Sequence, residues 1–286
     1  MSEKKKVEGS RFLRESKPAL KHLLGILLRK YGYASILAVD SEAKIYSVAA
    51  SGINIGDFGM LCNRGFVIKV YNEGEYAEYS FNKLERDVTE QAQQIIEQIE
   101  ALKKAVPDKL ERIKLGMLED KPLKFSKSTE YEINPFETGA QNIIDKLTAL
   151  RKKGLEADER MLDCTARMSC QKYSKLFLSE NKDMEQNVLW TDCAMSFLAR
   201  RGNEVKSYFS SASNLGGSEI LESLEADIPH SVEMTVALLD SEPMVPGEYD
   251  CICTPEVTGM IVHEAFGHGV EMDMFAKDRA LAKNYV

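Results

Sequence analysis

The chain has 286 residues, and its 37 Lys and Arg against 45 Asp and Glu give a formal net charge of -8. Hydrophobic residues make up 44% of the sequence and charged residues 29%. This composition excludes a wholly disordered chain and a membrane-embedded one. The acidic balance argues against a protein whose main role is to bind nucleic acid. The length is typical of two domains, and the absence of a run of about 18 apolar residues argues against a membrane span.

The cysteine content and the N-terminus indicate the compartment. Six cysteines are too few for a disulfide scaffold, and no two are spaced as Cys-x-x-Cys. The basic start at Lys4-Lys5-Lys6 lacks the apolar region that a secretory signal needs. We therefore expect a cytoplasmic protein with mostly reduced thiols and no membrane partner.

The first third of the chain predicts a helix, a β-meander and a second helix. Leucines at helical spacing from Leu20 to Leu28, with Pro18 near the first turn, predict the first helix. The second helix is predicted from about Val88 to Ala105. We expect residues 1–105 to form an α+β domain with a helix-flanked antiparallel sheet. Its β-like runs are 35–39, 44–50, 66–71 and 75–81.

The middle of the chain predicts a linker and a second α+β domain. Residues 106–136 hold prolines among many charged residues and few apolar repeats, so we expect a linker. A helix near Gln141–Lys153 and another from Ser231 to Leu239, after Pro229, flank further strands in a domain over residues 137–242. The β-like runs are 162–170, 173–179, 188–198 and 205–210.

The segment from Pro246 to Phe275 contains the residues that most resemble a catalytic site. Tyr249–Cys253 is typical of a short strand, and Thr254-Pro255-Glu256 is typical of a helix start with Thr254 as the cap. The predicted helix then carries His263-Glu264-Ala265-Phe266-Gly267-His268. Two imidazoles and a carboxylate are the groups with which zinc hydrolases hold the metal and activate water.

The spacing of the two histidines is unusual for a zinc motif. They are five residues apart, whereas the common motif spaces them by four. Five residues of a regular α-helix turn through about 140°, so His263 and His268 would not face one metal. A π-bulge would bring them toward one face, and Gly267 and Gly269 would ease that distortion. The alternative is a helix end with two unrelated histidines near the negative end of the dipole.

The residues from Pro243 to Asp273 resemble the TldD/PmbA metallopeptidase family, in which a Pro-Gly turn and a strand precede a helix with a His-Glu-x-x-x-His motif. Arg64-Gly65-Phe66 with Asn72-Glu73-Gly74 is similar to the family's first domain, and Gly216-Gly217-Ser218-Glu219 is similar to an element of its middle region. The resemblance implies a cytoplasmic zinc peptidase that acts on extended or unfolded peptides. It also implies a dimer with a second copy or a related subunit.

Carried over to this sequence, the resemblance implies that His263 and His268 bind Zn²⁺ and that Glu264 is the catalytic base. The family's third ligand is a cysteine in a β-rich C-terminal domain, and no position of this sequence matches it. We therefore expect residues 243–286 to be the incomplete start of that catalytic domain, in the front portion of a longer protein. Catalytic zinc normally has three protein ligands, so we expect this chain alone to bind zinc weakly and to cleave little.

Other residues near the motif leave alternatives open. Cys251 and Cys253 alternate to one face of the predicted strand and could supply a thiolate, although buried cysteines are common in core strands. Glu271 and Asp273 could orient a histidine ligand, ligate the metal, or be solvated acids.

Residues outside this segment have weaker signals. We expect His22 and His230 in surface or capping roles. No base near Cys164 or Cys193 in the sequence indicates that either is a nucleophile. The pair Gly216-Gly217 favours a turn over a phosphate loop. The alternative function is a non-catalytic module for peptide binding or dimerisation, in which an exposed strand edge takes up an extended peptide.

Overall fold

The structure is a computed structural model that describes residues 4–57, 63–105 and 116–285. The chain divides into two compact units, one of residues 1–105 and 117–241 and one of residues 106–116 and 242–286. The larger unit has the α+β fold that the sequence predicts. No helix in the described ranges is long and apolar enough to cross a membrane.

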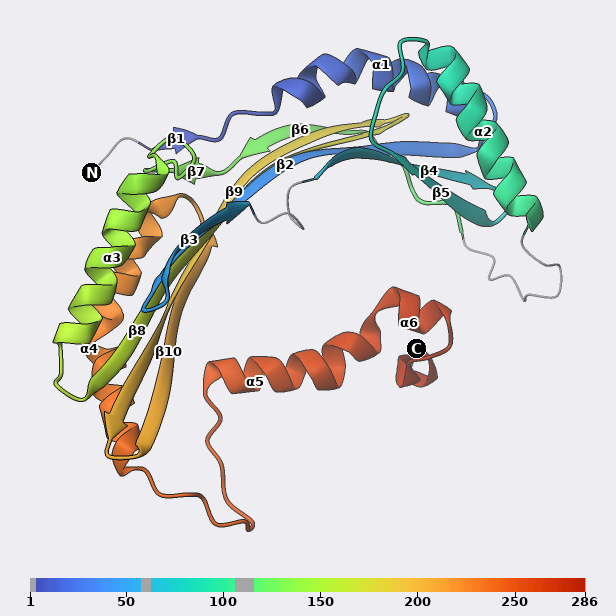
Figure 1. Cartoon of the computed structure of the whole chain (residues 1–286). Helices are drawn as coiled ribbons and strands as arrows, with labels where there is room; N and C mark the ends of the chain where they lie inside the picture. The colour runs from blue at the N-terminus through green and yellow to red at the C-terminus, as the bar shows by residue number, and fades with distance from the viewer. Residues whose placement is uncertain (1–3, 58–62, 106–115, 286) are drawn as a thin grey trace. The chain divides into compact units, whose positions relative to one another are not determined.

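An eight-stranded sheet forms the larger unit (Figure 1). Among the described strands, only β6 and β9 pair in parallel, and the other pairings are antiparallel. A two-stranded sheet of β1 (Lys5–Lys6) and β7 (Glu130–Tyr131) is separate. The large sheet has the order β10 (Glu204–Leu215), β9 (Lys182–Arg201), β8 (Met161–Ser179), β2 (Tyr33–Ala49), β4 (Arg64–Asn72) and β5 (Glu75–Phe81), with β3 (Gly52–Asp57) on β2 and β6 (Leu123–Ser128) on β9.

The strands β2 and β8 are each one long strand where the sequence predicts two short ones. Their register runs from Ser35 opposite Ser179 to Val48 opposite Ala166. Near the middle of this ladder the residues are polar, and Lys172 lies 3.6 Å from Glu42 in a cross-strand ion pair. Pairing along the whole length satisfies the backbone groups there, so the polar stretch remains extended.

The ladder between β2 and β8 joins two parts of the chain that the sequence predicts as separate domains. Residues 1–105 and 137–242 contribute strands to one sheet, so the predicted boundary between them is absent from the described residues. The predicted linker 106–136 contributes β6 to the same sheet, and its residues 106–115 lie outside the described residues. The division after Ser241 lies next to the boundary predicted before residue 243.

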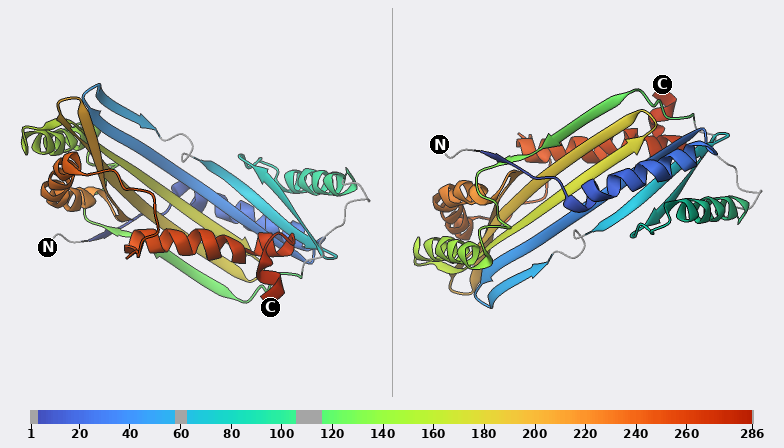
Figure 2. Two further views of the ribbon diagram at one scale, coloured as in Figure 1. Left: turned by 90° about the horizontal axis from the view of Figure 1, so that it is seen from below. Right: turned by 90° about the horizontal axis from the view of Figure 1, so that it is seen from above.

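Four helices of the described residues pack on one face of the sheet (Figures 1 and 2). α1 (Arg11–Leu28) and α2 (Val88–Ala105) lie toward one end, and α3 (Ala140–Glu156) and α4 (Leu221–Ala237) lie toward the other. The sequence predicts the bounds of α2. It does not predict that α1 and α4 continue through Pro18 and Pro229, where each helix loses one backbone hydrogen bond.

The core lies between this face and the helices in two clusters. Alternate residues of β2 point toward the helices, with Ile36 in the first cluster and Tyr46 in the second. Leu27 of α1 packs in the first cluster and Leu147 of α3 in the second, and both are fully buried. Burial of one such leucine contributes about 1.5–3 kcal/mol. Several buried side chains in each helix together offset an interior proline, which costs about 3 kcal/mol or more.

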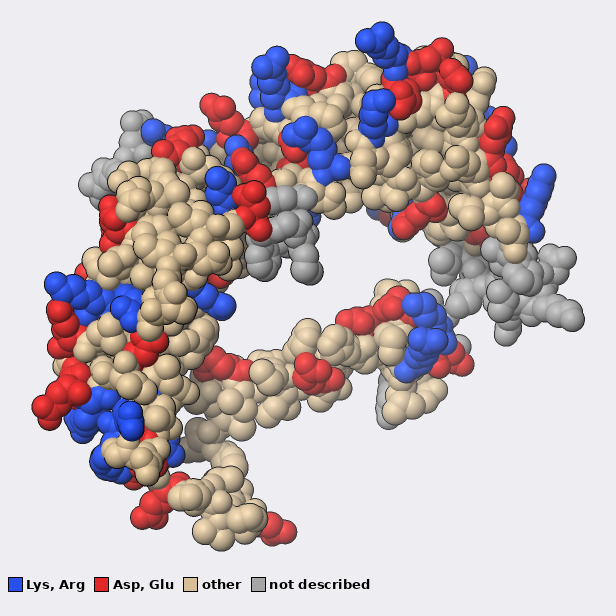
Figure 3. All heavy atoms as spheres, viewed as in Figure 1, with Lys and Arg blue, Asp and Glu red and all other residues tan. Residues whose placement is uncertain are grey.

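The charged side chains on α1 and α2 include both signs on the face drawn in Figure 3. Several form neighbouring ion pairs, such as Arg11 with Glu15 at 2.6 Å and Lys17 of α1 with Asp183 at 2.6 Å. The interspersed pattern agrees with the small excess of acidic residues in the sequence.

The smaller unit is irregular from residue 242 to 254 and mostly helical from Pro255 to Tyr285. Its elements are α5 (Pro255–Val262), η3 (His263–Gly267), η4 (His268–Val270), α6 (Met272–Ala276) and η5 (Leu281–Tyr285). The strand predicted at Tyr249–Cys253 is not formed, and residues 242–285 contain no strand. A strand requires a partner for its backbone groups, and this segment pairs with none in the described residues. The predicted start of a β-rich domain is therefore irregular from residue 243 to 254 and helical for most of its described residues after that.

Candidate metal centre

The run from His263 to His268 forms a π-helical turn at the end of α5. Pro255 occupies the first turn of α5, where its missing N–H is not needed. The helix continues to Val262, and the backbone N–H of His268 then donates to the carbonyl of His263. This five-residue step replaces the four-residue step of an α-helix. The π-bulge predicted from the histidine spacing is confirmed.

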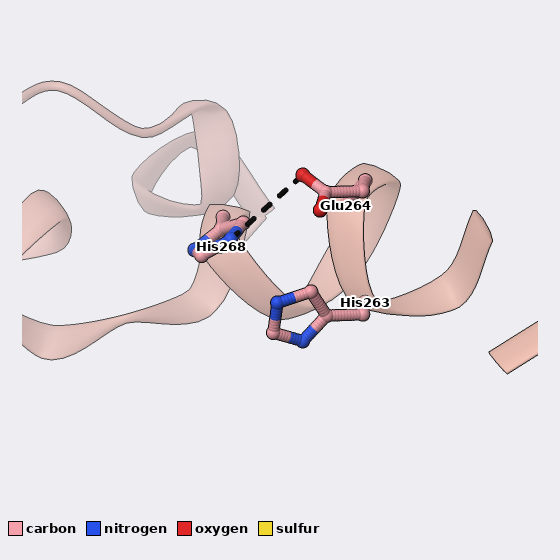
Figure 4. A group of neighbouring side chains, drawn as sticks. All are labelled: His263, Glu264 and His268. Carbon is pink, nitrogen blue, oxygen red and sulfur yellow. Dashed lines mark ion pairs between the residues drawn. The ribbon is translucent and has the colours of Figure 1, made fainter. Parts of the chain in front are cut away.

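The wide turn brings His263, Glu264 and His268 together (Figure 4). The two imidazole ring centroids lie 4.6 Å apart, with 68° between the ring planes. One ligand atom from each of the three residues lies within 4.8 Å of the others. Two nitrogens bound to one tetrahedral zinc lie about 3.3 Å apart, given Zn–N distances of about 2.0–2.1 Å. Small side-chain rotations would therefore suffice, and the imidazole and carboxylate donors fit zinc.

Carboxylates lie on both sides of the His268 ring. Nδ1 of His268 is 2.8 Å from Oε1 of Glu271, which is a hydrogen bond. Nε2 lies 3.8 Å from Oε2 of Glu264, which is too long for one. Of the two acids that the sequence offers as partners for a histidine ligand, Glu271 makes this contact and Asp273 pairs with Lys277 instead, at 3.2 Å.

The two glycines near the turn have ordinary helical or extended backbone, not the left-handed conformation. Gly267 has φ -55° and ψ -52°, and a Cβ there would lie 3.7 Å from Nδ1 of His263, an ordinary contact. A Cβ on Gly269 would meet nothing within 4 Å. Any residue can adopt such backbone angles, so the conformation of the π turn does not itself require glycine at either position.

The start of α5 differs from the predicted cap. Thr254 is the N-cap residue, but its side chain makes no capping bond to the backbone. The carboxylate of Glu256 instead accepts hydrogen bonds from its own backbone N–H and from the Thr254 side chain, which lower the pKa of Glu256. The acid therefore lies near the positive end of the helix dipole, as predicted.

The cysteines considered as extra zinc ligands do not belong to the group of His263, Glu264 and His268. Cys251 and Cys253 are exposed in an irregular segment, and Sγ of Cys251 donates to the carbonyl oxygen of Tyr249 at 3.6 Å. Because this segment is not a strand, the two thiols do not share a face for the reason that the sequence suggested.

The remaining candidates are structural. Burial raises the pKa of Cys164 to about 12 and that of Cys193 to about 11, so neither is a thiolate nucleophile at neutral pH. His22 lies exposed on α1, and His230 on α4 packs edge-on against the ring of Tyr208. Neither histidine belongs to the candidate metal site.

The Gly-Gly-Ser-Glu element is a turn with a contact that the sequence did not reveal. The Glu219 carboxylate accepts hydrogen bonds from the backbone N–H groups of Gly217 at 2.8 Å, Ile133 at 3.0 Å and Glu132 at 3.3 Å. Gly216 has φ +144°, which favours glycine. A Cβ on Gly217 would lie 1.8 Å from the carbonyl oxygen of Ile133. The element thus links the start of α4 to the chain before α3.

An apolar pocket of about 630 Å³ adjoins the cluster within the smaller unit. His268 lines both the pocket and the cluster. Most of the remaining lining is apolar, including Phe266, Val270 and Leu281, and Arg279 contributes the cationic side chain of the wall.

The sequence is similar to part of a curated protein, although no family model matches the chain. A protein named Metalloprotease from Methanothermobacter thermautotrophicus is 34% identical over 82 residues, which are 28% of this chain and 18% of that protein.

Three solved structures share the fold. Two are described as candidate modulators of DNA gyrase: the one from Bacteroides thetaiotaomicron has a TM-score of 0.63 and 15% identity over 89% of this chain, and the one from Thermotoga maritima has 0.61 and 15% over 81%. TldE from Thermococcus kodakarensis has a TM-score of 0.52 and 16% identity over 78% of this chain. The matches cover 57%, 50% and 47% of those chains, so this chain spans about half their length. The resemblance to the TldD/PmbA family is thereby confirmed in the fold.

Proposed function

We propose that this chain, which has the fold of the TldD/PmbA family, is the motif-bearing part of a zinc-dependent peptidase. Its substrates would be extended or unfolded peptides. The observation that carries the proposal is the π turn, which gathers two imidazoles and a carboxylate within 4.8 Å. The similarity to the protein named Metalloprotease from Methanothermobacter thermautotrophicus supports the same reaction class.

The three residues of the cluster divide into ligands and base. His263 and His268 would hold Zn²⁺, and Glu264 would act as the general base. Bound zinc supplies a lowered water pKa and a polarised substrate carbonyl. Glu264 adjoins His263 in the sequence, and its carboxylate lies 3.8 Å from Nε2 of His268, so it is next to both ligands. It takes a proton from the attacking water and gives that proton to the leaving amine.

The pocket beside His268 favours a hydrophobic side chain of the peptide near the bond that is cleaved. Its walls are mostly apolar. Its volume of about 630 Å³ is larger than one large side chain needs. Desolvation of an apolar side chain in such a pocket contributes about 25 cal/mol per Å² of buried area.

A substitution of Glu264 tests this assignment. Glu264→Gln keeps the shape of the side chain but cannot accept the proton, so turnover should fall by about 10²–10⁴-fold while zinc binding persists. Hydrolysis of a fluorogenic unfolded protein and zinc titration against a chromophoric chelator measure the two effects. The matched control is Glu256→Gln, in the first turn of α5, which should change neither.

Baseline measurements on the unsubstituted 286-residue chain set the scale. We expect weak zinc binding and little turnover, because His263 and His268 are fewer than the usual three protein ligands. Where turnover is too slow to measure, the Glu264 comparison requires a version that carries a third ligand. Nanomolar zinc affinity together with efficient hydrolysis by this chain would contradict the expectation.

A non-catalytic peptide-binding or dimerisation module is the second candidate, and one observation favours it. Among the described strands, β10 pairs with β9 alone and lies at the end of the sheet. An extended peptide or a second copy could add a strand to this edge. Peptide binding without cleavage, unaffected by a metal chelator, would favour this function, and sedimentation would measure the predicted dimer.

A further inference from the structure

The tautomer of a neutral His268 decides which of its nitrogens can bind a metal. A neutral imidazole carries a proton on one nitrogen and a free lone pair on the other. Only the lone pair can ligate. The hydrogen bond made by one ring nitrogen therefore selects the ligating nitrogen.

Two carboxylates compete for the imidazole proton of His268, at different distances. Glu271 lies 2.8 Å from Nδ1, within hydrogen-bond range, and Glu264 lies 3.8 Å from Nε2, outside it. Hydrogen bonds to an ionised carboxylate are about twice as strong as neutral ones. A proton on Nδ1 would therefore make the stronger hydrogen bond, and Nε2, on the Glu264 side of the ring (Figure 4), would keep its lone pair.

The backbone after the π turn explains why Glu271 reaches His268. Residues His268–Val270 form a 3₁₀ turn, η4, and in such a turn side chains three residues apart lie on one side. Glu271 then leaves the helical conformation, with φ -62° and ψ 130°, and becomes the N-cap of α6. Asp273 lies inside α6 and pairs with Lys277. The two acids after the motif are therefore not equivalent.

We propose that Glu271 is a positioning residue that holds His268 in the Nδ1-protonated form, with Nε2 directed to the metal. The inference deepens the proposed function and rests on it for the metal-binding step. The selection of the tautomer itself needs no metal.

The test compares Glu271→Ala, Glu271→Gln and Asp273→Asn with the unsubstituted chain. Nitrogen-15 NMR of the histidine rings, on metal-free protein about two pH units above the ordinary histidine pKa, reports the tautomer of His268 directly. We expect the Nδ1–H form in the unsubstituted chain and in Glu271→Gln, whose amide oxygen still accepts the hydrogen bond. Glu271→Ala should shift the ring toward the Nε2–H form.

Zinc titration gives the second readout. Loss of a partner that orients a metal ligand typically weakens metal binding by about 10–100-fold, so we expect that loss in Glu271→Ala and recovery of most of it in Glu271→Gln. Asp273→Asn removes the same charge two residues away and should have little effect. Circular dichroism checks that each variant keeps its helices.

Three outcomes decide the matter. An unchanged tautomer in Glu271→Ala would overturn the inference. Equal loss of zinc in Asp273→Asn would also overturn it, because the effect would then come from net charge. A tautomer shift in Glu271→Ala, with no zinc bound by any variant, would support the positioning by Glu271 and refute the proposed metal function.

Discussion

The number of residues between His263 and His268 should decide whether the two imidazoles share a metal. In the structure, the π turn spans five residues and leaves the ring centroids 4.6 Å apart. On a regular α-helix, a five-residue step would separate the side chains by about 140° and by about 7.5 Å along the axis. A four-residue step gives about 40° and 6 Å, and a six-residue step gives about 120° and 9 Å.

Two length variants use this difference. Deletion of Ala265 leaves the histidines four residues apart, so both stay on one helical face without a π turn. We expect the zinc affinity of this variant to stay within about tenfold of the original value. Insertion of a second alanine after Ala265 turns one imidazole away. We expect it to cost more than the about 100-fold that loss of an orienting partner costs, because a ligand itself is lost.

The assay is competition for zinc with a chromophoric chelator, together with the visible spectrum of bound Co²⁺, which responds to the number of ligands. Circular dichroism would show that both variants remain helical. Equal binding by the insertion, the deletion and the unsubstituted chain would refute the assignment of His263 and His268 as the ligand pair. A deletion that loses zinc as fully as the insertion would refute the argument from helical faces.

Two predictions concern the larger unit. Gly217→Ala should lower its free energy of unfolding, because the new Cβ would lie 1.8 Å from the carbonyl oxygen of Ile133. Overpacking of about 1–3 kcal/mol and a displaced hydrogen bond of about 0.5–1.5 kcal/mol give a loss of about 1.5–4.5 kcal/mol. Urea denaturation measures this loss, and Gly25→Ala, whose Cβ would meet nothing within 4 Å, is the control that should not lose stability. Burial raises the pKa of Cys164 to about 12 and of Cys193 to about 11, so between pH 9 and these values the unfolded state binds fewer protons. The free energy of unfolding should therefore fall as the pH rises above about 9, by up to about 1.4 kcal/mol per pH unit for each thiol. Urea denaturation at several pH values measures this dependence. A variant with both Cys164→Ala and Cys193→Ala that loses stability equally steeply with pH would contradict the prediction.

Local patterns in the sequence predict the elements whose stability is local. The apolar spacing of α2 predicts its bounds at Val88 and Ala105, because one helix face packs on the sheet. The same reasoning splits β2 and β8 into shorter strands at their polar middles. Those stretches are extended because each satisfies the backbone of the other, and a partner more than 100 residues away in sequence is not visible in a local pattern. For the same reason, the local pattern predicted separate N-terminal and middle domains, whereas the pairing of β2 with β8 joins these regions in one sheet.

The sequence by itself determined the chemical groups of the site: two histidines, the glutamate between them, and the unusual spacing that requires a wider turn. Only the folded chain decided which neighbours serve that site. Glu271 contacts His268 because a 3₁₀ turn aligns residues three apart, whereas Asp273 is drawn into α6 beside Lys277. Residue type sets what a side chain can do, but the backbone path sets which side chains meet.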